Sequence, residues 1–167
     1  MILSLNSLPP KLVSWGIAAS PVGKLLIGLT ERGEVCRVSF LGKQKANTIV
    51  AVWRKEWKKT QFSGGANVKN FAKKPILLVG TEFQHKVWRT MMIVPAGYVT
   101  TYGEIAKKIG KKGASRAVGS ACGANPVPYL VPCHRVIAAN SGLGGFSGGI
   151  EIKKILLKKE GAKIASN

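Results

Sequence analysis

The first forty residues alternate short apolar runs with turn signals. Apolar and β-branched residues gather in residues 13–19, 24–30 and 34–41, and the turn sequences Pro21-Val-Gly and Glu31-Arg-Gly separate them. Runs of this length bounded by proline and glycine are typical of strands joined by tight turns. The pattern therefore predicts an antiparallel meander of three strands, and its apolar face needs a cover.

The spacing of apolar residues changes to a helical period in the next segment. Between residues 46 and 59 the apolar residues recur at steps of three and four, at Ala46, Ile49, Val50, Trp53 and Trp57. This spacing places them on one stripe of a helix. We expect this helix to cover the sheet, and we interpret both tryptophans as core residues rather than as a ligand site.

A polar and basic segment without a consistent period, residues 60–74, interrupts the pattern. A second helical stripe follows over residues 81–94 and ends at Pro95-Ala-Gly. We place the domain boundary between these segments. The prediction is an N-terminal sheet-and-helix supporting domain over residues 1–78 and a C-terminal domain over residues 79–167.

Two short helices are predicted after this stripe. Thr101-Tyr-Gly-Glu104 fits a capping box, and Gly110 can end the first helix in a left-handed cap. Ser115 can cap a second helix that runs to about Cys122. Two short helices joined by a tight turn predict a helix-turn-helix, although many such hairpins bind no nucleic acid. The expected fold class is α/β (α+β), with a small N-terminal antiparallel sheet and helix and a mainly helical C-terminal domain.

Proline and glycine dominate the segments after the helix-turn-helix. Pro126, Pro128 and Pro132 exclude a regular helix and predict a rigid, extended crossing. Residues 141–149 hold five glycines around Leu143 and Phe146, which predicts a loop able to pass close to a ligand. A final helix is expected over residues 150–159, followed by Glu160-Gly, and its inward residues are expected to be Ile152, Ile155 and Leu156.

The charge of the chain narrows the range of partners. Its 167 residues include 26 Lys and Arg against 7 acidic residues, a formal net charge of +19. Nucleic acid is the commonest partner for such an excess, an anionic membrane surface is the rival, and a general solubility feature remains an alternative. No apolar run approaches the roughly 20 residues that span a bilayer. Residues 1–5 also lack the features of a signal peptide, so we expect an intracellular protein, cytoplasmic in a prokaryote or nuclear in a eukaryote.

Cysteine usage points to one reactive thiol. The three cysteines, Cys36, Cys122 and Cys133, cannot all pair, and no metal-ligand spacing is present, so we expect no metal. His134 follows Cys133 directly, and an imidazole can take the proton of a thiol. Neighbours in an extended segment point to opposite sides, so a bridging water is plausible, and such a dipeptide alone is more often structural. The other two cysteines are expected to pack as small apolar side chains.

Several motifs occur together in the C-terminal half. They are Phe83-Gln, Pro95-Ala-Gly, Thr101-Tyr-Gly-Glu-Ile-Ala, Arg116-Ala-Val-Gly, Asn125-Pro, Pro132-Cys-His-Arg-Val-Ile and the glycine loop through Glu160-Gly. In these motifs and their order the chain resembles the O6-alkylguanine-DNA alkyltransferases, or methylated-DNA–protein-cysteine methyltransferases. The N-terminal half is similar more loosely, through Ser20-Pro-Val-Gly-Lys-Leu-Leu.

The resemblance implies DNA repair by irreversible transfer of an alkyl group from O6-alkylguanine, or O4-alkylthymine, to Cys133. The chain would be a monomeric, single-turnover S-methyltransferase that acts on double-stranded DNA without a cofactor. His134 would act through a water and be polarised by Glu160. Asn125 would hold the turn that presents the cysteine, and Tyr102 would donate to the ring nitrogen of the departing guanine.

The resemblance also implies a set of substrate contacts. Arg116 would fill the space left by a flipped base, and the small residues Ala117 and Gly119 would let the second short helix approach the minor groove. The carbonyl of Val136 would accept from the exocyclic amine, and Ser147 would donate near O6. The full predicted set is Ser115, Arg116, Ala117, Gly119, Arg135, Val136, Phe146, Ser147 and Gly148, with phosphate contacts from Lys107, Lys108, Lys111 and Lys112. Phe146 stands where the family usually has tyrosine, which keeps an aromatic wall and loses a hydroxyl.

Three other functions are compatible with parts of this pattern. An alkyltransferase-like binder would recognise lesions without accepting the alkyl group, but it would carry a non-nucleophilic residue in place of Cys133. A transcription regulator would use the helix-turn-helix alone and be indifferent to loss of the thiol. A Cys-His hydrolase would turn over repeatedly on an ester or a peptide.

Overall fold

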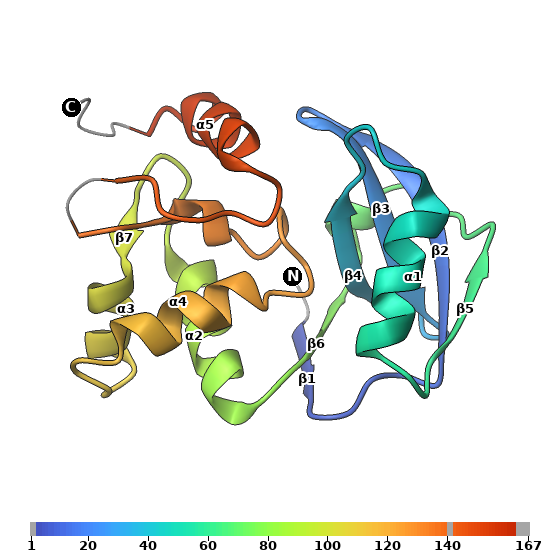
Figure 1. The fold of residues 1–167 in the computed structure, drawn as a ribbon, viewed down its shortest axis with the longest axis horizontal. Coiled ribbons are helices and arrows are strands. Elements are labelled where there is room, and N and C mark those ends of the chain that lie inside the picture. The colour runs from blue at the N-terminus through green and yellow to red at the C-terminus, as the bar shows by residue number, and fades with distance from the viewer. Residues whose placement is uncertain (1–2, 140–141, 163–167) are drawn as a thin grey trace. The chain divides into compact units, whose positions relative to one another are not determined.

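The computed structural model describes residues 3–139 and 142–162. The chain divides between Gly80 and Thr81 into two compact units, shown as a ribbon in Figure 1. Within the described ranges, no helix combines the length and the apolar character that a membrane crossing requires. The predicted α/β (α+β) class is confirmed.

The first unit contains a six-stranded sheet in the order β1-β6-β4-β3-β2-β5. Its strands are β1 (Leu3–Asn6), β2 (Leu12–Ser20), β3 (Gly23–Thr30), β4 (Val35–Phe40), β5 (Gln61–Gly64) and β6 (Ile76–Val79). The predicted antiparallel meander is confirmed as β2-β3-β4. The other three strands extend it in parallel pairs, β1 with β6, β6 with β4 and β2 with β5. The sheet is therefore mixed, which the sequence pattern does not predict.

Helix α1 (Ala46–Glu56) packs against this sheet, as Figure 1 shows. Its predicted apolar stripe is confirmed, because Ile49, Val50, Trp53 and Trp57 are all buried. They join Val13, Leu26 and other sheet residues in one apolar core. A single-turn helix, η1 (Phe71–Lys73), lies in the segment that was predicted to be irregular.

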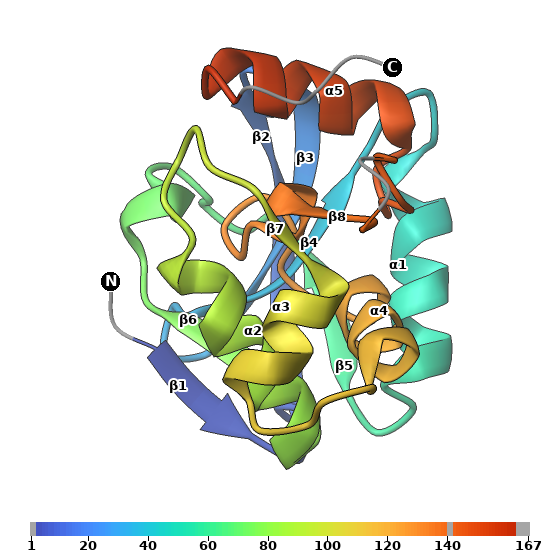
Figure 2. The same ribbon diagram turned by 90° about the vertical axis from the view of Figure 1, so that its left-hand side faces the viewer.

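The second unit is mainly helical. It contains α2 (Glu82–Ile93), β7 (Thr100–Thr101), α3 (Tyr102–Lys108), α4 (Ser115–Gly123), the single-turn helix η2 (Cys133–Arg135), β8 (Val136–Ile137) and α5 (Ile150–Lys159). In Figures 1 and 2 the short parallel pair β7–β8 lies between α5 and the group formed by α2, α3 and α4. The fully buried Trp88 joins two of these helices, because its Nε1 donates to the carbonyl of Ala121 at 2.8 Å.

The helix-turn-helix forms from α3 and α4. The Thr101 hydroxyl accepts from the Glu104 amide at 3.2 Å, and the Glu104 carboxylate accepts from the Thr101 amide at 2.7 Å, so the predicted capping box is confirmed. Gly110 ends α3 with φ 73, as predicted. The prediction that Ser115 caps α4 is wrong. Ala114 is the N-cap, and its φ of −82 and ψ of 24 already bend the chain toward the helix, so Ser115 is the first helical residue.

The inward face of α5 differs from the prediction at several residues, and the predicted inward residue Ile152 is only half-buried. Leu156 is buried as predicted, but Ile155 remains 43% exposed. Lys153 is fully buried instead, together with Leu157. The buried stripe of α5 therefore consists of residues 153, 156 and 157. The sequence pattern did not predict this stripe, because a lysine is rarely buried.

Candidate active site

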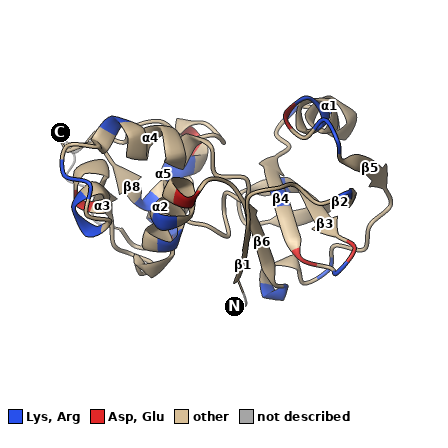
Figure 3. Ribbon diagram, turned by 90° about the horizontal axis from the view of Figure 1, so that it is seen from below, with Lys and Arg blue, Asp and Glu red and all other residues tan. Residues whose placement is uncertain are grey.

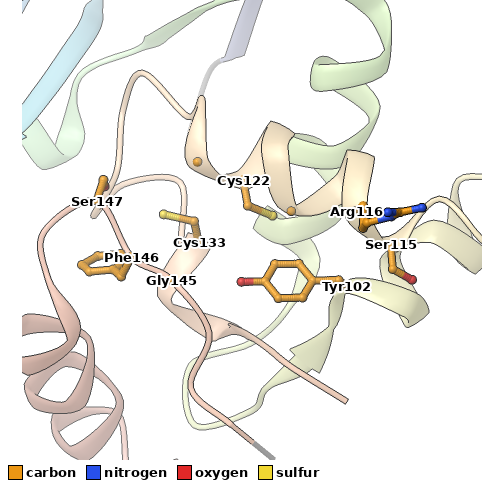
Figure 4. Close-up of a pocket in the computed structure, with 10 residues that line it drawn as sticks. Tyr102, Ser115, Arg116, Cys122, Cys133, Gly145, Phe146 and Ser147 are labelled. Carbon is orange, nitrogen blue, oxygen red and sulfur yellow. The ribbon is translucent and has the colours of Figure 1, made fainter. Parts of the chain in front are cut away.

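A cavity of about 520 Å³ opens within the second unit. Its volume falls in the range of small-molecule sites, about 300–1,000 Å³. Its lining comes from α3, α4, η2 and the glycine loop, as Figure 4 shows, and consists of Tyr102, Ser115, Arg116, Gly119, Cys122, Gly123, Cys133, Gly145, Phe146 and Ser147. Side chains from segments far apart in the sequence therefore meet around a cavity that is bordered by the thiol of Cys122 and by that of Cys133.

Asn125 shapes the segment that presents this thiol. Its Nδ2 donates to the Val131 carbonyl at 2.9 Å, and its Oδ1 accepts from the Val127 amide at 3.0 Å. The Val131 amide also donates to the Val127 carbonyl at 3.0 Å. The prediction of an extended crossing is wrong here, because these bonds close residues 125–131 into a tight loop. The loop delivers Cys133 to the first position of η2.

Cys133 lies in the cavity wall but is only 6% exposed. Burial raises the pKa of its thiol, whereas a hydrogen bond with Asn125 and the positive charge of Lys153 lower it. Burial raises the pKa of Cys36 and of Cys122 to about 12 each. Cys133 differs from the other two cysteines by its bond to Asn125, which favours the thiolate.

Glu160 joins the two residues that follow the cysteine. Its Oε1 lies 2.9 Å from Nε2 of His134 and 2.8 Å from Nη2 of Arg135, and its Oε2 accepts from Nε of Arg135 at 3.0 Å. Arg135 also donates from Nη1 to the Val94 carbonyl at 2.6 Å. The forked pair of Arg135 and Glu160 fixes the carboxylate, so that it can orient the imidazole.

Proton positions follow from this arrangement. Burial lowers the pKa of His134, although the bond to Glu160 opposes the shift, so the ring is neutral at neutral pH. Burial would raise the pKa of Glu160, but hydrogen bonds from Arg135 and His134 outweigh it and lower this pKa. A neutral ring beside a carboxylate carries its proton on Nε2. The buried Nδ1 of His134, which has no hydrogen-bond partner within the described ranges, is then a free acceptor.

Tyr102 begins α3 and points its hydroxyl into the cavity, on the side of Cys133 and Phe146 in Figure 4. Burial, with a smaller contribution from Cys122 and Cys133, raises the pKa of Tyr102, so its hydroxyl stays protonated and can donate.

The glycine loop passes close to Tyr102. Gly144 has φ +66, and a Cβ built there would lie 2.7 Å from the Tyr102 hydroxyl oxygen. The loop therefore approaches Tyr102 closely at Gly144, its passage close to a ligand stays a prediction, and Ser141 lies outside the described residues. The Phe146 ring lines the cavity and meets the His134 ring edge-on, with centroids 6.3 Å apart. Ser147 lies beside it in the lining.

Four of the nine residues in the predicted contact set lie on α4: Ser115, Arg116, Ala117 and Gly119. Arg116 and Ala117 are exposed, and Arg116 points away from the cavity in Figure 4. A Cβ at Gly119 would come no closer than 3.9 Å to Tyr102, so packing within the chain does not require glycine there. Four residues of the predicted contact set lie outside the cavity lining: Ala117, Arg135, Val136 and Gly148.

Lys153 is a residue of the site that sequence reasoning missed. Its Nζ donates to the Val136 carbonyl at 2.6 Å and to the Leu143 carbonyl. Its spacing from Leu156 and Leu157 is the signal that could have revealed it. In the described part of the chain, no group of three His, Cys, Asp or Glu side chains is arranged to hold a metal ion.

Known proteins share this sequence and architecture. Residues 82–162 match the family described as "6-O-methylguanine DNA methyltransferase, DNA binding domain". A methylated-DNA–protein-cysteine methyltransferase of Methanosarcina acetivorans is 39% identical over 155 residues, which cover 89% of this chain and 98% of the relative. The protein of the same name from Shigella flexneri is 47% identical over 87 residues, 52% of this chain and 51% of the relative.

Two solved structures are similar over most of the chain. The crystal structure of Mycobacterium tuberculosis OGT in complex with DNA is 32% identical with a TM-score of 0.70, covering 89% of this chain and 93% of that one. The O6-methylguanine-DNA methyltransferase of Pyrococcus kodakaraensis is 28% identical with a TM-score of 0.67, covering 90% and 99%.

Fold and site together define an α/β protein with a helix-turn-helix and a buried thiol, followed in the sequence by a histidine that is bonded to a carboxylate, which is the class of the DNA alkyltransferases. The chain belongs to the family of the methylated-DNA–protein-cysteine methyltransferases.

Proposed function

We propose that this protein repairs DNA by moving an alkyl group from O6 of guanine to the sulfur of Cys133. The observation that carries the proposal is the position of this thiol. It lies in the wall of a cavity that α4 of the helix-turn-helix also lines, with His134 and Glu160 joined directly behind it. DNA is the substrate, so the protein acts in the compartment that holds DNA.

The thiol must become a thiolate before it attacks. We assign the proton to Nδ1 of His134, reached through a water molecule, because Nε2 is committed to Glu160. The Glu160 carboxylate then stabilises the imidazolium that forms. Asn125 keeps Cys133 at the start of η2 through its two bonds across the loop. His134 and Glu160 therefore favour the thiolate of Cys133, and Asn125 fixes its position.

The transfer forms one carbon–sulfur bond and breaks one carbon–oxygen bond. The electron pair of the broken bond stays on guanine, and the Tyr102 hydroxyl donates toward the ring nitrogen so that a neutral base leaves. The thiol loses one proton and guanine gains one, so the number of protons is unchanged. His134 passes its extra proton to solvent, and Tyr102 recovers its own from solvent. The product is a thioether, whose carbon–sulfur bond has no chemical step to release it. Each protein molecule therefore acts once.

The base has to leave the duplex to reach this cavity, and extrusion costs a few kcal/mol unless something fills the gap. Arg116 is exposed on α4 and points outward, as a residue that replaces the base in the stack should. Ala117 and Gly119 leave the surface of α4 low enough for close approach. Within the cavity we assign Ser147 as a donor near O6, and the carbonyl of Val136 as an acceptor for the exocyclic amine.

The decisive experiment mixes the protein with duplex DNA that contains O6-methylguanine and locates the product by peptide mass spectrometry. We expect the mass of one methyl group on the peptide that contains Cys133, in one equivalent per protein. Cys133→Ala should leave the lesion unrepaired, whereas Cys36→Ala, a change in the core of the other unit, should repair it. A lesion that persists beside excess protein, or repeated turnover by a limiting amount, would contradict the proposal.

A further inference from the structure

A second hollow lies within the first unit, away from the residues of the active site. Its volume is about 870 Å³, against about 520 Å³ for the cavity beside Cys133. Its walls come from the connection between β1 and β2, the turn after β3, and the connection between α1 and β5. We call it the β1–β2 groove, and its lining consists of Leu8, Pro9, Pro10, Lys11, Leu12, Glu31, Glu56, Trp57, Lys58, Lys59, Thr60 and Gln61.

Hydrogen bonds within the chain join the two main walls of the β1–β2 groove. The Thr60 hydroxyl donates to the Pro10 carbonyl at 2.7 Å, and the Gln61 amide donates to the Lys11 carbonyl at 2.8 Å. The ring of Pro10 also restricts the backbone of the first wall. The groove is therefore formed before a partner arrives, and binding there costs little ordering of the chain.

Leu8 gives the β1–β2 groove an apolar side chain that the chain itself leaves uncovered. This leucine is 70% exposed, and its amide donates to Oδ1 of Asn6 at 3.3 Å. Pro9 and Pro10 beside it are only half-buried. A bulky apolar residue held at the mouth of a hollow is a suitable contact for an apolar side chain of a partner.

Lysines surround this apolar part. The lysines of the lining are exposed, and none of the ion pairs found among the described residues includes them: Lys11, Lys58 and Lys59. Of the two carboxylates in the lining, that of Glu56 already pairs with Arg37. Three lysines therefore stand against one uncompensated carboxylate, that of Glu31, and the groove attracts acidic groups.

The lining favours a peptide over a nucleic acid. Grooves that bind single strands stack the bases on exposed aromatic rings. The aromatic residue of this lining, Trp57, is buried and stacks on Phe62, with ring centroids 6.5 Å apart. Phosphates would also meet the carboxylates of Glu31 and Glu56. An extended peptide can place apolar and acidic side chains close together, which is what Leu8 and the lysines require.

We propose that the β1–β2 groove is a docking site for an extended acidic segment of another protein. A bulky apolar side chain of that segment packs against Leu8, and its carboxylates pair with the lysines of the lining. The inference goes beyond alkyl transfer and uses none of its residues, so the two proposals can fail separately.

The test begins with a displayed library of random dodecapeptides, selected on the immobilised full chain. Excess undamaged duplex DNA is present during selection, so that acidic peptides do not collect on the DNA-binding surface. We expect the retained peptides to combine several acidic residues with a bulky apolar one. Retention of no peptide, or of basic or purely apolar peptides, would overturn the inference.

Fluorescence anisotropy with a labelled retained peptide then shows where it binds. Leu8→Ser should weaken binding about tenfold, because an apolar contact is lost. The double change of Lys58 and Lys59 to Gln should weaken it about threefold at low salt and less at high salt. Affinities unchanged in both variants would overturn the inference.

Two matched controls lie in the same unit but outside the lining. Ile17→Ser removes an apolar side chain that is 48% exposed, and the double change of Lys43 and Lys45 to Gln removes the same charge from another exposed place. Both should bind the peptide as the unchanged chain does. Urea unfolding checks that every variant is folded, and methyl transfer from O6-methylguanine DNA should proceed at the unchanged rate in all of them.

Two further measurements test the other possible occupants of the β1–β2 groove. An excess of single-stranded oligothymidylate should not displace the peptide, and sedimentation of the full chain should show no self-association that Leu8→Ser abolishes. Displacement would assign the groove to nucleic acid, and such self-association would assign it to a second copy of this chain. Either result would overturn the inference.

Discussion

At the scale of single residues, Glu160 lies where it can fix the protonated nitrogen of His134. The Glu160 carboxylate accepts one hydrogen bond from Nε2 of His134 and two from Arg135, donated by its Nε and Nη2 atoms. Its position 26 residues after His134 gives no local signal in the sequence, and only the fold brings the two side chains to 2.9 Å.

Replacing Glu160 by Gln should slow alkyl transfer by about 10- to 100-fold at neutral pH, because the imidazolium loses its counter-charge. Single-turnover kinetics on O6-methylguanine DNA measure this change. Glu151→Gln, at the exposed start of the same helix, is the matched control and should react at the unchanged rate. Equal rates for Glu160→Gln and the control would refute the role assigned to Glu160.

The same carboxylate makes folding stability depend on pH. The folded protein holds the pKa of Glu160 below its unfolded value, so its contribution is present above about pH 4.3 and is lost as the pH falls through the folded value. We expect Glu160→Gln to unfold more easily by about 1–3 kcal/mol at pH 7. Urea unfolding should show this difference shrinking toward zero below pH 4, and a difference that persists in acid would contradict the charge-based explanation.

At the scale of elements, the N-terminus of α3 holds Tyr102 in the site. The capping box of Thr101 and Glu104 fixes the turn at which Tyr102 enters the helix, and the Thr100 hydroxyl donates a second hydrogen bond to the Glu104 carboxylate at 3.0 Å. The direction in which the Tyr102 hydroxyl points therefore depends on a helix cap that lies outside the cavity.

Thr101→Ala should lower the free energy of unfolding by about 1 kcal/mol. It should also slow alkyl transfer, because the first turn of α3 can fray and release Tyr102. Thr100→Ala, which loses one side-chain bond and leaves the box intact, should change both quantities less. Urea unfolding and single-turnover kinetics on the two variants provide the comparison, and a repair rate untouched by Thr101→Ala would show that the cap does not position Tyr102.

Elements with a long, regular apolar period could be predicted from the sequence. The meander β2-β3-β4, α1 and α2 each show enough repeats of one period to be recognised. The four-residue strands β1, β5 and β6 are too short for a period, and their partners are distant in the sequence. The start of α4 was misplaced by one residue, because a serine beside a turn can be either the cap or the first helical residue.

The candidate site could be predicted only in part. Cys133, His134 and Asn125 stand in a short proline-containing motif that narrows the chemistry. The folding of residues 125–131 into a closed loop could not be read from the prolines, because it depends on the Asn125 amide bonding across the loop. The burial of Lys153 could not be predicted, because burying an ammonium group is unfavourable unless acceptors such as the Val136 carbonyl lie within hydrogen-bond distance, and only the fold shows that they do.

At the scale of the whole molecule, the positive charge is divided almost evenly. Residues 1–80 include 13 basic and 3 acidic residues, a charge of +10, and residues 81–167 include 13 basic and 4 acidic residues, a charge of +9. Figure 3 shows blue segments in both units and few red ones. Charge alone therefore does not distinguish the unit that carries the helix-turn-helix.

Salt dependence can show which lysines meet the phosphates. Each phosphate contact contributes a slope of about −0.9 to the plot of log affinity against log salt. We expect the double change of Lys111 and Lys112 to Gln, in the turn after α3, to reduce the slope for undamaged duplex DNA by about two. The matched double change of Lys58 and Lys59 in the first unit should leave the slope unaltered. Equal effects of the two pairs would mean that DNA binding is not confined to the helix-turn-helix.

The contact between Gly144 and Tyr102 sets the direction in which the substrate range of this protein can be altered. No side chain fits at Gly144 without pushing the tyrosine aside, whereas a Cβ at the neighbouring Gly145 would meet nothing within 4 Å. Gly145 also borders the cavity. Engineering for larger or smaller adducts should therefore begin at residue 145 and leave residue 144 unchanged.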